Sequence, residues 1–358
     1  MPSKPRAREL GIPLEGTPGP LNSITDVEGI EVGYATIIEG PATRTGVTII
    51  HPRGKRDHDP VYAGHSAFNG NGEMTGAAWV EEGGFLEGPI GITNTHSVGV
   101  VRDAIIDWQI RHGAMFQKWS CPVVGETADG WLSDMNGFHV RAEHVWLALE
   151  SAAAGAVAEG NLGGGTGMIC YEFKGGSGTS SRRLPADLGG WTIGALVQAN
   201  FGRRYQLTIS GVPVGKHLTS DAPFSHGANP FRGDDGSLIV ILATNAPLLP
   251  HQLKRLARRA TIGMSRTGSV GGNGSGDIFL AFSTANRGAA DPASGIAAVE
   301  SLSNDHLDPL LAASAYATEE AIINALVAAE TMTGRDGLTV RALPHAELQK
   351  LMQEYRSV

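Results

Sequence analysis

The sequence has few cysteines, and it lacks the apolar segments that secretion or membrane insertion requires. Cys121 and Cys170 are the two cysteines among 358 residues, and they form neither a Cys-x-x-Cys motif nor a framework of disulfide bridges. No apolar run reaches the ~18 residues that a membrane span requires, and no apolar segment follows the basic N-terminus. These absences favour a cytoplasmic protein with no membrane partner.

Positive charge is also scarce. The chain carries 28 Lys and Arg against 36 Asp and Glu, a net charge of −8, and has no basic block interleaved with aromatic residues. Nucleic acid is therefore not an expected partner. His65 and His96 follow none of the HxH, HxxxH or HExxH spacings, so we expect no metal and no cofactor.

Glycine, by contrast, is abundant, with 49 residues, about twice the usual ~7%. One glycine-rich loop, residues 271–277, reads Gly-Gly-Asn-Gly-Ser-Gly-Asp between a basic amphipathic segment and an apolar one. A serine between glycines is free to adopt unusual backbone angles and to expose its hydroxyl, as a nucleophile requires. A plain turn and a phosphate-binding loop are the alternatives, although a dinucleotide loop runs from strand to helix and this one runs from helix to strand.

The periodicity of apolar residues predicts a mixed α/β chain with strands grouped in hairpins. Layered sheets covered by helices fit this pattern, and the chain can form one domain over residues 1–358. The expected strands are 24–38, 45–50, a hairpin of 191–200 with 205–214, a doubly buried strand 237–244, and 278–284. The expected helices are 98–111, 142–158, 250–264, 308–333 and 343–355.

Four motifs in the same order resemble the DmpA family of self-processing L-aminopeptidase/D-esterases, whose close relatives are β-peptidyl aminopeptidases. They are Asn-Gly-Ser-Gly-Asp at 273–277, Gly-Gly-Gly-Thr-Gly-Met at 163–168, Phe-Lys-Gly-Gly-x-Gly-Thr-Ser-Ser-Arg at 173–182 and Ala-Thr-Glu-Glu-Ala-Ile at 317–322. The resemblance covers nearly the whole chain. It implies an αββα sandwich.

The resemblance also implies a precursor that cleaves itself between Gly274 and Ser275. The products are an α chain of residues 1–274 and a β chain of residues 275–358. A free α-amine has a pKa just below ~8, so the new N-terminal amine of Ser275 can accept the proton of its own hydroxyl.

Further site residues follow from the same resemblance. The family stabilises the oxyanion with a tyrosine and an asparagine, which correspond here to Tyr171 and to Asn245, with Asn200 as the second choice. Without the resemblance, Asn245 reads as a helix cap and Asn200 as a turn residue.

The family orients its nucleophile through a hydroxyl and a glutamate, which here are Thr318 and Glu320. Because positions i and i+2 face different sides of a helix, both contribute only in a first or irregular turn. Otherwise they are exposed polar residues of a helix start. Glu159 corresponds to the carboxylate that meets the amino terminus of the substrate.

The implied function is an N-terminal-nucleophile aminopeptidase that releases the first residue of small peptides, amides or esters through an acyl-enzyme on Ser275. β-Peptidyl specificity and an acyltransferase of the ornithine acetyltransferase type are the alternatives, and a non-enzymatic relative is a third. The resemblance further implies a homo-oligomer, a tetramer of αβ units.

Overall fold

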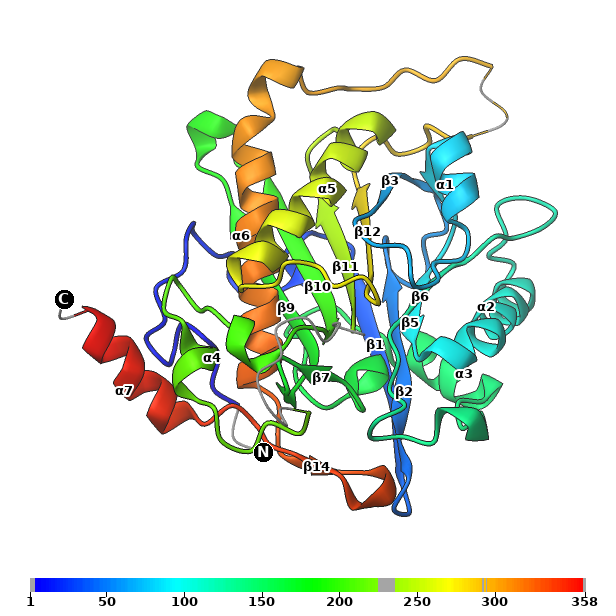
Figure 1. The fold of residues 1–358 in the computed structure, drawn as a ribbon. Coiled ribbons are helices and arrows are strands. Elements are labelled where there is room, and N and C mark those ends of the chain that lie inside the picture. Colours follow the sequence, from blue (N-terminus) through cyan, green and yellow to red (C-terminus); the bar gives the residue numbers. More distant parts are fainter. Residues whose placement is uncertain (1–3, 225–235, 292, 294, 357–358) are drawn as a thin grey trace.

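The computed structural model describes residues 4–224, 236–291, 293 and 295–356. Two β-sheets lie face to face at the centre of the molecule. Helices cover the outer face of each sheet, which gives four layers (Figure 1). The αββα sandwich implied by the resemblance is therefore confirmed. The apolar side chains between the sheets, among them Ile92, Ile239 and Leu280, form one buried cluster.

The first sheet has four strands in the order β1-β2-β5-β6. Their bounds are β1, Glu31–Glu39; β2, Thr43–His51; β5, Ile90–Thr93; and β6, Val123–Glu126. β1 and β2 pair antiparallel from Glu31↔His51 to Glu39↔Thr43, which confirms the first predicted hairpin although residues 24–26 form a 3-10 turn. Helices α2 (Val98–His112) and α3 (Ala142–Ser151) cover this sheet.

The second sheet has six strands in the order β4-β3-β12-β11-β10-β9. Their bounds are β3, Val61–Ala67; β4, Phe85–Leu86; β9, Gly176–Arg183; β10, Thr192–Asn200; β11, Ser237–Thr244; and β12, Gly276–Ser283. Every residue of β11 is buried, as its continuous apolar sequence predicts. Helices α5 (Pro250–Arg266) and α6 (Asp308–Val327) cover the outer face (Figure 1).

The remaining elements are short or lie at the edges. They are α1, Ala77–Gly83; α4, Val214–His217; α7, His345–Arg356; and the paired two-residue strands β7, Ile169–Cys170, with β8, Phe173–Lys174, and β13, Met332–Thr333, with β14, Thr339–Val340. The predicted hairpin of 191–200 with 205–214 is wrong, because β10 pairs with β9 and β11 and residues 205–214 form no strand.

α6 is long and apolar enough to cross a membrane by length and composition alone. However, 89% of its most apolar window is buried, because it packs on α5, β9 and β10. It therefore has the surroundings of a core helix.

The register of the second sheet defines two ends that matter for the site. β11 and β12 run parallel, with Ser237 beside Gly276 and Thr244 beside Ser283. Asn200 pairs with Ser237 in turn. We call the edge formed by Asn200, Ser237 and Gly276 the Gly276 end, and the opposite edge the Ser283 end.

Candidate functional site

The glycine-rich loop connects the C-terminus of α5 to the first residue of β12, as the sequence predicts. Left-handed backbone occurs at Gly268 (φ 102°) and Gly271 (φ 67°), which only glycine adopts readily. The Ser275 backbone nitrogen donates to the Gly272 carbonyl at 3.1 Å, and the next nitrogen, of Gly276, donates to the Gly236 carbonyl at 3.2 Å. The serine is thus held at the Gly276 end by a turn on one side and a strand on the other.

Ser275 differs from the sequence-based expectation in two respects. Its side chain is buried, with 1% of the residue exposed, and it does not belong to the residues with left-handed backbone. The hydroxyl donates to Oδ1 of Asp277 at 2.8 Å. The loop therefore presents an oriented hydroxyl rather than an exposed one.

Two asparagines that follow β3 hold the glycine-rich loop. The Asn69 side-chain nitrogen donates to the Gly272 carbonyl at 3.1 Å and to Oδ2 of Asp277 at 3.0 Å. The Asn71 side-chain nitrogen donates to the Gly274 carbonyl at 2.8 Å. Sequence reasoning noticed the polar Asn-Gly-Asn-Gly segment but could not find its partner, which lies about two hundred residues further along the chain.

Tyr171 and Asn200 lie on the same side of the sheet as Ser275. The backbone nitrogen of Tyr171 donates to the carbonyl of Phe201, which directly follows Asn200, and the tyrosine hydroxyl is 2.7 Å from Oγ1 of Thr267 at the end of α5. The side chain of Asn200 accepts from the Ile169 nitrogen at 2.8 Å and donates to the Ala128 carbonyl at 2.9 Å. Both side chains are therefore fixed near the Gly276 end.

A pocket opens beside these residues. It is lined by Trp131, Glu172, Asn200, Phe201, Phe224 and Gly236, among others. The carbonyl of Gly236 accepts from Gly276, so the pocket borders the start of β12. The rings of Trp131 and Phe224 are 4.6 Å apart and form an apolar wall, which suits a side chain of a small substrate.

Glu126, the last residue of β6, brings a buried carboxylate to the Gly276 end from the other sheet. Its oxygens accept from the Glu73 nitrogen at 2.9 Å and from the Thr95 hydroxyl. A Cβ on Gly72 would lie 3.0 Å from this carboxylate and 3.2 Å from Cα of Gly276, so the two groups are close neighbours. Burial raises the pKa of Glu126, and hydrogen bonds from Thr95 and Glu73 only partly oppose it. Sequence reasoning gave this residue no role.

The structure places Asn245, the first-choice oxyanion donor, at the opposite end of β11 from Ser275. Asn245 follows Thr244 at the Ser283 end, and its side-chain oxygen accepts from the Thr192 nitrogen at 2.8 Å. The eight residues of β11 separate it from Ser275 by roughly 25 Å. Nor does Asn245 cap α5, whose N-cap is Leu249.

Among the described residues, no hydrogen bond or ion pair joins Ser275 to Thr318 or Glu320, the expected orienting pair, although Thr318 packs against Gly263 near the C-terminus of α5. Both residues lie in the middle of the regular helix α6, and the Thr318 hydroxyl donates to the Ser314 carbonyl of the same helix. Glu320 is fully buried and contacts Arg8 at 2.9 Å and Arg182 at 2.7 Å. Because Arg182 is one residue from the end of β9 and pairs with Ile193, this cluster lies toward the Ser283 end.

Glu159 likewise has a partner in the chain itself. Its carboxylate is 2.7 Å from Nε of Arg6 and accepts from the Thr179 nitrogen at 2.8 Å. Thr179 belongs to the edge strand β9, which two strands, β10 and β11, separate from β12. Within one chain, Glu159 is therefore bound to the edge strand β9, and its contact with a substrate stays a prediction. Burial raises its pKa to about 7 even though Arg6 opposes this shift.

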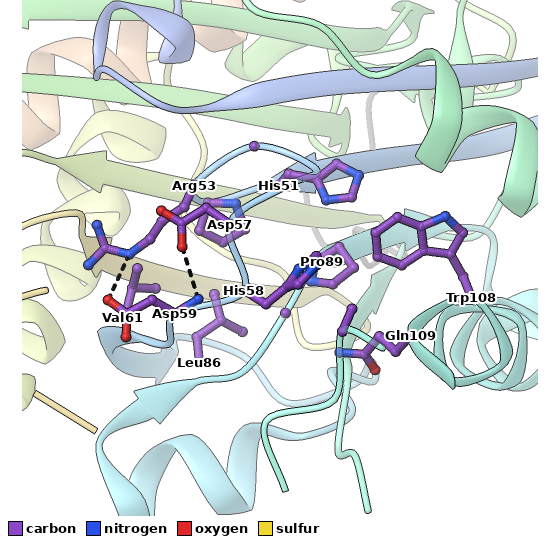
Figure 2. A pocket seen from close by; sticks show the side chains of 14 residues that line it. His51, Arg53, Asp57, His58, Asp59, Val61, Leu86, Pro89, Trp108 and Gln109 are labelled. Atoms are coloured by element: carbon purple, nitrogen blue, oxygen red, sulfur yellow. Dashed lines mark hydrogen bonds and ion pairs between the residues drawn. The ribbon is translucent and has the colours of Figure 1, made fainter. Parts of the chain in front are cut away.

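A second pocket lies away from this site. Figure 2 shows the side chains that line it, among them His51, Asp57, His58 and Trp108, with Arg53 beside Asp59. Arg53 donates to the carbonyls of Thr284 and Ala285, which follow the C-terminus of β12. This pocket is at the Ser283 end and has no contact with Ser275.

Comparison with known proteins gives one consistent result. The model of peptidase family S58 matches residues 22–340. The β-peptidyl aminopeptidase BapA of Sphingosinicella microcystinivorans is 51% identical over 98% of this chain and 93% of its own length. The protein of the same name from Sphingosinicella xenopeptidilytica is 46% identical over 98% of this chain and 91% of its own.

Solved structures agree with these relatives. A β-aminopeptidase of a Burkholderia species has 48% identity and a TM-score of 0.91, covering 98% of this chain and 99% of its own. The L-aminopeptidase D-Ala-esterase/amidase of Ochrobactrum anthropi has 48% identity and a TM-score of 0.92, covering 99% of both chains. The latter is described as a prototype of the serine aminopeptidases and a variant of the Ntn hydrolase fold.

Proposed function

Since the chain belongs to peptidase family S58 and is a serine aminopeptidase of the N-terminal-nucleophile type, we propose that Ser275 is its nucleophile and that self-cleavage after Gly274 activates it. The proposal rests on the position of Ser275 in the turn directly before β12, where its hydroxyl donates to Asp277 at 2.8 Å. Cleavage leaves an α chain of 274 residues and a β chain of 358 − 274 = 84 residues.

The free amine of Ser275 then acts as the base of the peptidase reaction. An α-amine has a pKa of roughly 8, so a useful fraction is unprotonated at neutral pH. It accepts the hydroxyl proton while Oγ attacks the carbonyl carbon of the first residue of the substrate. The acyl-enzyme that forms is hydrolysed by water, which regenerates the hydroxyl.

Tyr171 and Asn200 are the proposed groups around the developing oxyanion. Both are buried at the Gly276 end, and both have their orientation fixed by hydrogen bonds to the surrounding backbone or to Thr267. Donors that are fixed before the reaction stabilise charge more strongly than donors that must reorganise. We prefer Asn200 to Asn245 because the strand register puts Asn245 at the Ser283 end.

A β-amino acid at the N-terminus of the substrate is the second candidate specificity. Two curated relatives and one structural neighbour are named for β-peptides, whereas the Ochrobactrum protein is named for L-amino acids and D-Ala esters and amides. Matched p-nitroanilides of L-alanine, D-alanine and β-homoalanine distinguish these classes through their kcat/KM values. A higher value for the β-substrate would place this chain with the β-peptidyl enzymes.

The intact mass of freshly purified protein tests the nucleophile. We expect the parent protein to be split after Gly274, and the Ser275→Ala variant to remain one chain without peptidase activity. Ser265→Ala, on the exposed face of α5, serves as the matched control and should split normally. Normal splitting of Ser275→Ala would show that another residue is the nucleophile.

Assembly into a tetramer of αβ units and a cytoplasmic location remain predictions. Mass photometry of the split protein tests the first, and a single αβ unit of about 37.4 kDa as the sole species would contradict it. Cell fractionation tests the second.

A further inference from the structure

In the uncleaved precursor, the free amine of Ser275 does not yet exist, so another group must accept the proton of the Ser275 hydroxyl. Before cleavage, the nitrogen of Ser275 is an amide whose electron pair is delocalised, so it cannot serve as a base. The same nitrogen donates a hydrogen bond to Gly272. Self-cleavage therefore requires a second basic group within reach of the hydroxyl.

Asp277 is placed to be that group. Its Oδ1 accepts the Ser275 hydroxyl at 2.8 Å, and its side chain is fully buried. Its other oxygen, Oδ2, accepts from Asn69 at 3.0 Å, which fixes the rotation of the carboxylate and directs Oδ1 at the serine. Asn69 also holds the Gly272 carbonyl, so one side chain positions both the base and the loop.

Asn71 contacts the carbonyl group of Gly274, which belongs to the peptide bond that is attacked. Its side-chain nitrogen donates to the carbonyl oxygen of Gly274 at 2.8 Å, and this oxygen becomes the oxyanion when the preceding peptide bond is attacked. The segment that carries Asn71 lies against β12 so closely that a Cβ on Gly276 would be 2.5 Å from the Asn71 carbonyl. The donor is thus held at a fixed distance from the scissile bond.

We propose that Asp277 and Asn71 are catalytic residues of the maturation cleavage, with Asn69 as their positioning residue; this inference rests on the proposed function of Ser275. Asp277 takes the hydroxyl proton as Oγ bonds to the Gly274 carbonyl carbon. Asn71 stabilises the resulting oxyanion. The carbon–nitrogen bond then breaks, and Asp277 returns the proton to the leaving amine of Ser275. One water hydrolyses the ester that remains, which frees the Gly274 carboxylate and the serine hydroxyl.

Cell-free synthesis of the full chain followed by intact mass against time tests the proposal. Replacing an acid–base group slows such reactions by roughly 10²–10⁴-fold, so Asp277→Asn should accumulate as uncut chain. Asn71→Ala should split about ten- to a hundredfold more slowly than the parent, because Asn71 is exposed to solvent and is a weaker donor than a buried one. Asn273→Ala removes an exposed amide from the same loop and should split at the parental rate.

Different results separate this inference from the function on which it rests. A parent chain that never splits would overturn the proposed function itself. If the parent chain splits, and Asp277→Asn and Asn71→Ala both split as fast as the parent, only the present inference is overturned. If Asp277→Asn alone is slowed, Asn71 is not the oxyanion donor.

Cleavage rates and thermal unfolding midpoints together distinguish a misfolded variant from a folded variant that cleaves slowly. Asn71→Asp has nearly the shape of the native residue but presents a carboxylate to the oxyanion, so it should be slower than Asn71→Ala while its thermal unfolding midpoint stays near that of the uncut Ser275→Ala chain. Equal rates for the two Asn71 variants, with unchanged unfolding midpoints, would show that the amide hydrogen plays no part.

Discussion

Two clusters of polar residues lie on the second sheet, each around a buried group, and they have different roles. At the Gly276 end, Ser275, Asp277, Asn69 and Asn71 exchange hydrogen bonds around one peptide bond. Toward the Ser283 end, Glu320 contacts Arg8 and Arg182, and Asn22 donates to it at 2.5 Å. The first cluster surrounds the peptide bond between Gly274 and Ser275, the proposed cleavage site, whereas the second balances a buried charge.

The second cluster contains Glu320, which belongs to a conspicuous sequence motif and whose partners among the described residues do not include Ser275. Arg8 and Arg6, close to the N-terminus, reach Glu320 and Glu159 more than one hundred and fifty residues away. Such pairs fasten the beginning of the chain to α6 and to the segment before β9. Their removal should lower stability, whereas changes in the first cluster should lower the rate of chemistry.

The largest expected effect on stability comes from Glu320→Gln. The variant keeps the shape of the side chain but leaves Arg182, which is 1% exposed, without its counter-charge. Leaving a buried charge unpaired costs about 3–5 kcal/mol of unfolding free energy. Urea unfolding of the variant in the uncut Ser275→Ala chain measures this loss, and Glu143→Gln, on the exposed face of α3, is the control.

The dependence on pH sharpens the same test. Burial alone would raise the pKa of Glu320, but the charges of Arg182 and Arg8 and the hydrogen bonds from Arg8 and Asn22 outweigh it, so the pKa is lowered below its ordinary value of 4.5. The folded state then binds fewer protons than the unfolded state, and stability falls as the pH drops below about 4.5. Glu320→Gln should lose this part of the acid sensitivity. An unchanged acid limb would contradict the assigned role.

A smaller effect, on the rate of turnover, is expected from Tyr171→Phe. The change removes one proposed oxyanion donor and the hydrogen bond to Thr267 at 2.7 Å. We expect kcat/KM to fall about ten- to a hundredfold, while stability falls by only about 1 kcal/mol. Tyr62→Phe, whose ring stacks on Phe85 at 4.6 Å, is the matched control and should keep parental kinetics. Parental kinetics for Tyr171→Phe as well would remove the tyrosine from the site.

Local patterns in the sequence were sufficient for most of the fold. The apolar run of 237–244 is the doubly buried strand β11, and the amphipathic segment after it is α5. The predicted helices 142–158 and 308–333 are too long because the structure ends them at Ser151 and Val327, where alanine-rich sequence gives no stop signal. The hairpin of 191–214 failed because β10 finds its neighbours far along the chain rather than in the next segment.

Sequence reasoning brought candidate site residues together only where neighbours in the sequence are also neighbours in space. The glycine-rich loop and Tyr171 follow local motifs and lie on the same side of the sheet. The contact of Asn71 with Gly274 depends on the pairing of β3 with β12, which no local pattern reveals. Asn245 and Glu320 were assigned by resemblance of short motifs, which carries no information on the direction of strands or on charge partners.

The smallest expected effect on kcat/KM is that of replacing Asn245 at the Ser283 end, which we compare with replacing Asn200 at the Gly276 end. Asn245→Ala removes an exposed side chain that accepts one hydrogen bond from Thr192. Because it lies at the Ser283 end, kcat/KM should stay within about twofold of the parent and stability should fall by about 1 kcal/mol or less. Asn200→Ala, at the Gly276 end, removes two hydrogen bonds beside the pocket and should lower kcat/KM by at least about tenfold. The reverse ranking would contradict the placement of the oxyanion at the Gly276 end.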